Sequence, residues 1–193
     1  NLKFNSIVVS SGLIGEQFSI KSFARCHAIK GDKIIIKNLK WIEHFAQALA
    51  HFLRIKLLKE KKKFSFETVF SHESKLDIMR KAKAEGYKVY LYFISTNSPE
   101  INKSRVKLRV KKGGHNVPAD KIESRYYRSL DLLYKAAQYS YQTYFWDNSK
   151  DQPEMFKHFK VENGKKKWKK VKDKEIPNWF IKYYSDKVVQ KEI

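Results

Sequence analysis

Two stretches of sequence decide the fold of this chain: Phe64-Ser65-Phe66-Glu67-Thr68-Val69 and Arg105-Val106-Lys107-Leu108-Arg109-Val110-Lys111-Lys112-Gly113-Gly114-His115-Asn116-Val117-Pro118. In the first stretch, apolar residues lead to a Glu-Thr pair, which predicts a strand over residues 64–69. In the second, a basic helix stops at a double glycine. A carboxylate and a hydroxyl at the carboxyl end of a strand lie where open α/β sheets bind their ligands.

The residues between the two stretches predict a strand–helix–strand unit. Residues 73–85 have the pattern of an amphipathic helix that ends at Gly86, and residues 87–95 are a nearly continuous apolar run, typical of a parallel strand covered on both faces. Helices are also predicted at 41–59, 99–112 and 119–137, and strands at 5–9, 33–37 and 141–146. These patterns predict an α/β fold with a mainly parallel sheet flanked by helices.

The end of the chain predicts a different, smaller element. Asn163-Gly164 between two short strand patterns, 156–161 and 165–171, is the strongest local signal for a two-residue β-hairpin. A terminal helix is expected at residues 177–189. We therefore expect an α/β domain over residues 1–150, with residues 151–193 as a hairpin and helix that extend the same domain.

A series of short motifs follows these elements in a fixed order. They are Phe66-Glu67-Thr68-Val69, Ser71-His72, Gly86-Tyr87-Lys88-Val89, Arg105-Val106, Arg109-Val110, Gly113-Gly114-His115, Val117-Pro118, Ile122, Arg125, Arg128-Ser129 and Asp147-Asn148-Ser149. In this order and spacing the chain resembles the zeta-toxin-like P-loop kinases from about Trp41 through Ser149. The resemblance implies a P-loop kinase-like fold and ATP-dependent phosphorylation of a small hydroxyl-bearing substrate, such as a nucleotide sugar.

The resemblance also implies roles for five residues that would hold the nucleotide. Arg109 and Arg125 match the two arginines of the family that face phosphate, and they are the expected catalytic residues. Fixed guanidinium groups stabilise the charge that develops on the oxygens of a transferring phosphoryl group. Arg105, Arg128 and Asn148 are expected to contribute to nucleotide binding. The alternative for each arginine is an ordinary solvated charge on a helix.

Three further residues are expected to bind substrate or Mg²⁺. They are Glu67 and Thr68, at the end of the predicted strand, and His72 shortly after it. ATP and Mg²⁺ are the implied cofactors, and no metal held by the protein alone is expected. Cys26 is the only cysteine, so a cysteine metal cluster and an intrachain disulfide are both excluded.

One part of the family pattern is not found. A phosphate loop, Gly-x-x-x-x-Gly-Lys-Ser/Thr, needs its lysine to neutralise phosphate and its hydroxyl to hold Mg²⁺. The nearest segment is Ser10-Ser11-Gly12-Leu13-Ile14-Gly15-Glu16-Gln17, where Glu16 stands in place of the lysine. Two interpretations remain open: the loop lies upstream of Asn1, or the chain is a kinase-derived module without activity.

The charge of the chain favours anionic partners. The formal net charge is +21, from 41 Lys and Arg against 20 Asp and Glu. Lysines concentrate in the hairpin at 157–172, interleaved with Phe159 and Trp168, which would suit nucleic acid. Lysines that protect an exposed edge strand are the alternative explanation. The second hypothesis is therefore a non-catalytic module that binds nucleic acid or a protein.

Other partners and the cellular location are also predicted from the sequence. The resemblance implies a nucleotide-sugar substrate and an antitoxin protein. The sequence has no run of about 18 apolar residues and no signal-peptide pattern, so we expect no membrane association and a cytoplasmic location.

Overall fold

The computed structural model describes residues 25, 27–31, 33–37, 42–171 and 174–190. These residues fall into two compact units, 1–66 and 67–193. The expected strand at 5–9 and the segment 10–17 lie outside the described residues. In the first unit, β1 (His27–Lys30) and β2 (Lys33–Ile36) form an antiparallel hairpin, and α3 (Ile42–Lys59) is the predicted helix.

The strand predicted at 64–69 is wrong, because these residues form a loop. A strand needs a neighbour for its backbone groups, and no described strand pairs with this segment. The two phenylalanines of the segment make local contacts instead. The rings of Phe64 and Phe66 stack with centroids 6.3 Å apart, and the Arg54 guanidinium lies 4.8 Å from the centroid of Phe66. The alternation of apolar and polar residues therefore has a local cause.

The second unit contains a four-stranded sheet in the order β3-β4-β5-β6. The strands are β3 (Tyr90–Ser95), β4 (Gln142–Asp147), β5 (Glu154–Glu162) and β6 (Lys165–Lys170). The α/β architecture with flanking helices is confirmed, but only the β3–β4 pair is parallel, so the described sheet is not mainly parallel. The reason is that the predicted hairpin joins the same sheet, and a two-residue connection links only antiparallel strands.

The hairpin prediction is confirmed at the residue level. Asn163 and Gly164 connect β5 to β6 with φ of 52° and 75°, the left-handed conformation that a two-residue turn of this type requires. A bulge lies in β5 where it pairs with β4, since Phe145 is opposite Lys157 while Trp146 is opposite Met155. The intervening residue, Phe156, has no partner on β4, and its side chain is buried.

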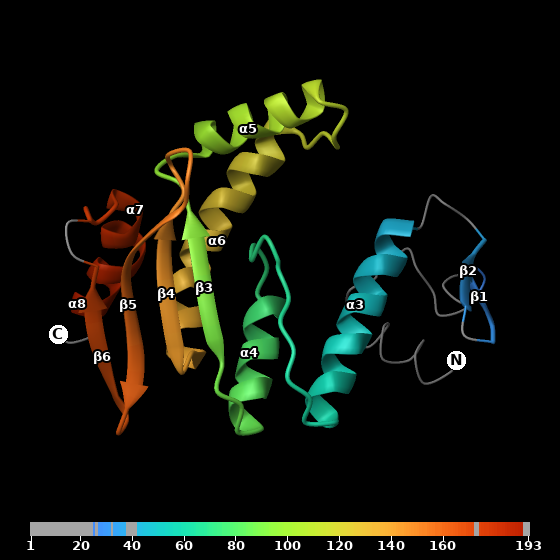
Figure 1. Ribbon diagram of the computed structural model, residues 1–193, viewed down its shortest axis with the longest axis horizontal. Coiled ribbons are helices and arrows are strands. Elements are labelled where there is room, and N and C mark those ends of the chain that lie inside the picture. The colour runs from blue at the N-terminus through green and yellow to red at the C-terminus, as the bar shows by residue number, and fades with distance from the viewer. Residues whose placement is uncertain (1–24, 26, 32, 38–41, 172–173, 191–193) are drawn as a thin grey trace. The chain divides into compact units, whose positions relative to one another are not determined.

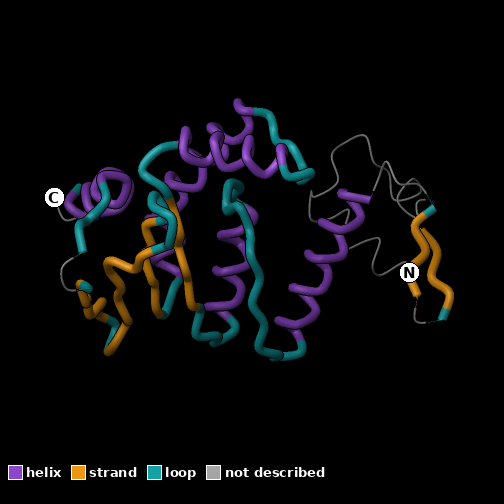
Figure 2. Tube along the Cα trace, turned by 45° about the horizontal axis from the view of Figure 1, so that its top comes forward, coloured by secondary structure: helices purple, strands orange, loops and turns teal. Residues whose placement is uncertain are grey.

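The helices of the second unit also match their predictions. They are α4 (Ser74–Ala84), α5 (Pro99–Lys111), α6 (Ala119–Tyr139) and a terminal segment made of α7 (Asn178–Phe180), a π-helical turn (Ile181–Ser185) and α8 (Asp186–Val189). Figure 1 shows α5 at the end toward which the β3 and β4 arrows point, and Figure 2 shows the same arrangement from a second direction. Helix α6 runs behind these two strands in Figure 1.

The core of the second unit lies between one face of the sheet and the helices α6 and α7 with the π-helical turn. Phe145 is fully buried at its centre, with ring centroids 4.8 Å from Phe180 and 5.3 Å from Tyr184. Leu130 and Leu133 of α6 are fully buried in the same unit. Burial of a large aromatic side chain stabilises the fold by several kcal/mol, roughly 3–5 for Phe to Ala. This packing fixes the carboxyl ends of β3 and β4. Helix α5 begins at this end of the sheet, and α6 packs against α5.

Candidate anion-binding site

A cavity of about 360 Å³ lies at the carboxyl ends of β3 and β4. Its polar lining comes from Thr68, Ser95, Thr96, Asn102, Arg109, Arg125, Ser129 and Asn148. Val69, Ile94, Val106, Val117 and Ile122 supply apolar walls. The volume is within the usual range for small-molecule sites, roughly 300–1,000 Å³. The location is also the usual one, because parallel strands direct their following loops to one edge of the sheet.

The loops that follow β3 and β4 are tied together by hydrogen bonds. The backbone N–H of Asn148 donates to the Ser95 carbonyl at 2.7 Å, and the backbone N–H of Asn97 donates to Ser149 Oγ at 2.8 Å. Ser149 Oγ in turn donates to Asp147 Oδ1 at 2.6 Å. The motif Asp147-Asn148-Ser149 therefore links the loops that follow β3 and β4. These hydrogen bonds fix the positions of the residues that line this side of the cavity.

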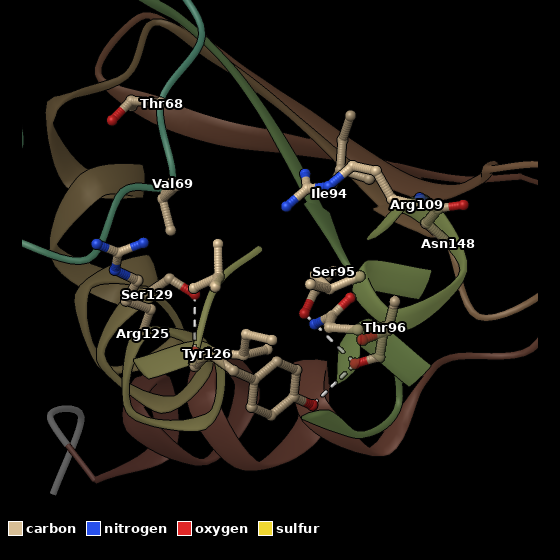
Figure 3. Close-up of a pocket in the computed structure, with 14 residues that line it drawn as sticks. Thr68, Val69, Ile94, Ser95, Thr96, Arg109, Arg125, Tyr126, Ser129 and Asn148 are labelled. Atoms are coloured by element: carbon tan, nitrogen blue, oxygen red, sulfur yellow. Dashed lines mark hydrogen bonds between the residues drawn. The ribbon is translucent and has the colours of Figure 1, made fainter. Parts of the chain in front are cut away.

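Tyr126 of α6 fixes the same floor from the helix side. Its hydroxyl donates to the Thr96 carbonyl at 2.8 Å, as Figure 3 shows. Burial raises the pKa of Tyr126 to about 12, so the phenol stays protonated and remains a donor at physiological pH. The Ser129 hydroxyl, one turn further along α6, donates to the Tyr126 carbonyl at 2.7 Å.

Arg109 approaches the cavity from the last turn of α5 (Figure 3). Its Nε donates to the His115 carbonyl at 3.1 Å, so the turn after the helix holds the side chain. Gly114 provides the space for this contact: a Cβ at that position would lie 2.6 Å from Arg109 Cγ. The Gly113 φ of +82° makes the turn itself. The two glycines therefore have different roles. Gly113 adopts the left-handed backbone conformation of the turn, and Gly114 leaves space for the Arg109 side chain.

Arg125 approaches the cavity from the other helix, α6. Its guanidinium makes no hydrogen bond or ion pair with any residue that the structure describes. Helices α5 and α6 are linked by a salt bridge between Lys103 and Glu123. A hydrogen bond from Lys103 to Glu123 also raises the pKa of Lys103. Two arginines from two linked helices thus line one cavity, and a bound anion would complete their hydrogen bonding.

The structure brings together four of the eight predicted site residues: Thr68, Arg109, Arg125 and Asn148 line the cavity. The other four lie elsewhere in the described residues. Glu67 and Arg128 are exposed and do not line it. His72 is also exposed, and its Nδ1 accepts from the Ser74 amide at 3.2 Å at the start of α4. Arg105 donates to the Lys150 carbonyl at 2.8 Å and borders a neighbouring hollow with Lys112.

Several lining residues were not predicted from the sequence. Ser95 and Thr96 carry a recognisable signal, because they are the polar residues that directly follow a buried apolar run. Ser129 belongs to the Arg128-Ser129 motif of the resemblance but was given no role, and Asn102 and Tyr126 carry no signal. They lie within helices, and only the packing of α5 and α6 at this edge of the sheet directs them toward the cavity.

The lining residues fit a phosphate group but not a divalent cation. Guanidinium, amide and hydroxyl groups are the donors that phosphate oxygens need. No Asp or Glu side chain is among the residues that line the cavity, and the described residues contain no cluster of three or more metal-ligating side chains. Mg²⁺ prefers carboxylate oxygens. These residues alone therefore do not form a Mg²⁺ site.

The fold and the site define a class of protein: an α/β domain with a cavity at the carboxyl edge of its parallel strand pair, lined by two arginines from two helices. The comparison with known families is more specific. The sequence model of the zeta toxin family matches residues 30–151, and the chain belongs to that family. The matched range includes every residue that lines the cavity. Membership supports a P-loop kinase-like function.

Two further comparisons add less. A Haemophilus influenzae protein, itself described as uncharacterized, is 38% identical over 81 residues, which are 42% of this chain and 55% of that protein. The chain thus spans about half the length of this curated relative. No solved structure matches the chain significantly. Within the described residues, no helix has the length and apolar character needed to cross a membrane.

Proposed function

We propose that the chain is an ATP-dependent phosphotransferase that acts on a small hydroxyl-bearing substrate, with a nucleotide sugar as the first substrate to test. The observation that carries the proposal is the pair of arginines that line one cavity from two different helices. Membership of the zeta toxin family supports the reaction class. The relative from Haemophilus influenzae gives no further support, because it is uncharacterized.

In this proposal the two arginines have the same chemical role from opposite directions. Bound ATP would supply the phosphoryl group. Arg109, held by its bond to the His115 carbonyl, donates its terminal N–H groups to phosphate oxygens on the α5 side. Arg125 does the same from α6. Preorganised donors stabilise developing charge without reorganisation, and one such donor typically contributes roughly 2.7–4 kcal/mol to catalysis.

Asn148 and Thr68 are proposed to orient the ligand rather than to carry charge. Asn148 is held by its backbone bond to Ser95, so its side chain is presented at a fixed point of the cavity wall. Thr68 lines the cavity through the loop before α4. We keep Glu67, His72, Arg105 and Arg128 as predicted contributors, though these residues do not line the described cavity.

The test is the effect of ATP on thermal unfolding of the full chain, with and without Mg²⁺. A ligand that binds the folded state raises the unfolding temperature, by an amount that grows with ligand concentration. We expect a rise with ATP that Arg125→Ala abolishes. Lys121→Ala is the matched control, because Lys121 lies one turn earlier on the same helix, is exposed and does not line the cavity. No rise at millimolar ATP, or equal losses in both variants, would refute the proposal.

Mg²⁺ is proposed as a cofactor from family membership alone. Because the described lining contains no carboxylate, we expect the stabilisation by ATP to persist in the presence of a chelator. Complete loss of stabilisation on chelation would instead show that the chain binds ATP as its Mg²⁺ complex.

An antitoxin protein is the partner that family membership suggests, and we propose it for that reason. An antitoxin that covers the cavity would compete with ATP. Co-purification of the chain with the product of an adjacent gene, and release of that product by the variant Arg109→Ala, would test the idea.

The second function, binding of nucleic acid or a protein without catalysis, is favoured by the lysines of the hairpin at 157–172.

A further inference from the structure

The face of the sheet opposite the core carries tyrosines on two adjacent strands; we call it the open face. Tyr90, Tyr92 and Ile94 alternate with buried residues along β3, and their exposed fractions are 49%, 59% and 55%. On β4, Tyr144 lies directly opposite Tyr92. The two rings stack with centroids 4.7 Å apart and an angle of 13°. These side chains form one flat aromatic surface rather than scattered exposed residues.

The aromatic rows continue across the sheet into lysines. His158 of β5 lies opposite Tyr144, and the rings stack with centroids 5.5 Å apart. Lys169 of β6 lies opposite His158 and completes the row. The neighbouring row runs in register from Tyr90 through Gln142 and Lys160 to Lys167. Each row therefore leads from an exposed tyrosine on β3 to an exposed lysine on β6.

The β5–β6 half of the open face is strongly cationic. By strand alternation it carries Lys160, Lys165, Lys167 and Lys169, with Glu162 as the acidic residue among them. Glu162 Oε1 lies 3.1 Å from Lys160 Nζ, and its Oε2 lies 3.0 Å from Lys167 Nζ. The Glu162 carboxylate thus forms ion pairs with two lysines. Lys165 and Lys169 form no ion pair with the described residues, so a positive excess faces outward.

The aromatic residues of the hairpin itself face the other way. Phe159 is fully buried, and Trp168 packs against it with centroids 4.9 Å apart. The Lys157 ammonium lies 4.7 Å from the Trp168 centroid, on the core side of the sheet. Phe159, expected from sequence to be available for stacking, is therefore committed to the core, whereas Trp168 is 38% exposed but lies on the core side of the sheet. The rings on the open face are the tyrosines of β3 and β4.

We propose that the open face binds single-stranded nucleic acid, with bases stacked on Tyr90 and Tyr92 and phosphates held by Lys165 and Lys169. An exposed ring on a flat sheet can stack with any base, and a nearby row of lysines can follow the phosphate backbone. The charge opposes a second copy of the same face as the partner, because the lysines of both copies repel. An acidic protein would pair with the lysines but would not need the exposed tyrosine rings, so it accounts for only half of the open face.

This inference rests on the second function proposed above, binding of nucleic acid, and is independent of the phosphotransferase proposal. Ile94 is the residue that the open face and the cavity share, and the proposed tyrosines and lysines do not line the cavity. Substitutions on the open face can therefore be tested in a chain whose cavity is intact.

The experiment is fluorescence anisotropy of a labelled 12-nucleotide oligo-U or oligo-dT with the full chain, over a series of salt concentrations. Tyr92→Ala should weaken binding about tenfold, and Tyr92→Phe should leave it unchanged, because stacking needs the ring and not the hydroxyl. Tyr127→Ala is the matched aromatic control: Tyr127 is 42% exposed but lies on α6, on the core side of the sheet.

The lysines are tested by the salt dependence. Lys169→Ala should lower the slope of log affinity against log salt by about 0.7, the value for one phosphate contact with a single strand. Lys182→Ala, an equal change of charge on the terminal segment, should leave the slope unchanged. Circular dichroism and thermal unfolding check that each variant is folded.

Four results would overturn the inference. The first three are no binding at low salt, equal binding by Tyr92→Ala and the parent chain, and equal affinity for inorganic polyphosphate of matched charge. Displacement of the oligonucleotide by poly-glutamate at matched charge would overturn it in favour of an acidic protein partner. Binding that requires both Tyr92 and Lys169, with no effect of the Tyr127 and Lys182 controls, would confirm it.

Discussion

The substitution Gly114→Ala tests whether the double glycine positions Arg109. A Cβ at residue 114 would lie 2.6 Å from Arg109 Cγ, 3.3 Å from its Cδ and 3.0 Å from its carbonyl oxygen. For the first contact to reach 3.4 Å, the shortest ordinary distance, Cγ must move by 0.8 Å. The 3.1 Å bond from Arg109 Nε to the His115 carbonyl would not survive that movement in its present geometry.

Two quantities should change. Loss of the bond to His115 should lower the free energy of unfolding by about 1 kcal/mol, the usual net value of one hydrogen bond. Displacement of the guanidinium should remove a charge-assisted hydrogen bond to phosphate, which is worth about 1.5–3 kcal/mol. That loss corresponds to an increase of roughly 10- to 150-fold in the dissociation constant for ATP.

Gly113→Ala is the matched control, because its effect has a different physical origin. A Cβ at residue 113 has no atom within 4 Å, but the φ of +82° disfavours any residue with a side chain. It should therefore lower stability by roughly 1–2 kcal/mol and leave the ATP affinity of the folded protein nearly unchanged. Urea unfolding measures the first quantity, and calorimetric titration of ATP measures the second.

A double-mutant cycle makes the test decisive. If Gly114→Ala acts through Arg109, the double variant with Arg109→Ala should bind ATP no more weakly than Arg109→Ala alone. Additive losses would show that Gly114 acts on the ligand by another route. Unchanged ATP affinity in Gly114→Ala would refute the proposal that Gly114 positions Arg109 for the ligand.

Three smaller predictions concern stability. Tyr126→Phe removes the donor to the Thr96 carbonyl and should lower the free energy of unfolding by about 1 kcal/mol, measured by urea unfolding. Asn163→Ala places a less tolerant residue at a φ of 52° and should cost about 1 kcal/mol, whereas Asn163→Gly should cost less in the same assay. Hydrogen bonds, first from Lys167 and then from a second lysine, lower the pKa of Glu162, so its stabilisation is present above the ordinary value of 4.5 and is lost as pH falls through the lowered pKa. Glu162→Gln should therefore make stability less dependent on pH in the acid range, and an unchanged acid profile would contradict this.

The parts of the fold that could be predicted from sequence are those with local causes. Asn163-Gly164 specifies its turn through backbone conformation alone, so the hairpin was predicted at the correct residues. Residues 64–69 show the limit of the same reasoning. Their alternation is a strand pattern, but a strand also needs a neighbour, and a local pattern does not contain that information. The pairing of β4 with β5, which makes most of the described sheet antiparallel, was missed for the same reason.

The site residues likewise divide into those that sequence reasoning placed correctly and those whose position depends on tertiary contacts. Family resemblance selected Arg109 and Arg125, and both line the cavity, whereas Arg105 and Arg128, one helical turn away from them, do not. On a helix, a difference of three or four residues leaves a side chain on nearly the same face, so periodicity alone could not separate the members of each pair. The difference is tertiary: Arg105 is held by the Lys150 carbonyl.

The geometry of the α5–α6 connection explains why Arg109, rather than a neighbouring cation, reaches the cavity. The helix α5 ends in a run of basic residues that the sequence makes nearly equivalent, and the turn after it distinguishes them. Gly113 reverses the backbone, and Gly114 leaves space for the stem of Arg109 to cross the turn and donate to His115. The turn thus converts a generally basic helix into a helix with one positioned guanidinium. A sequence that kept every lysine and arginine but replaced Gly114 would keep the charge of the site and lose its geometry.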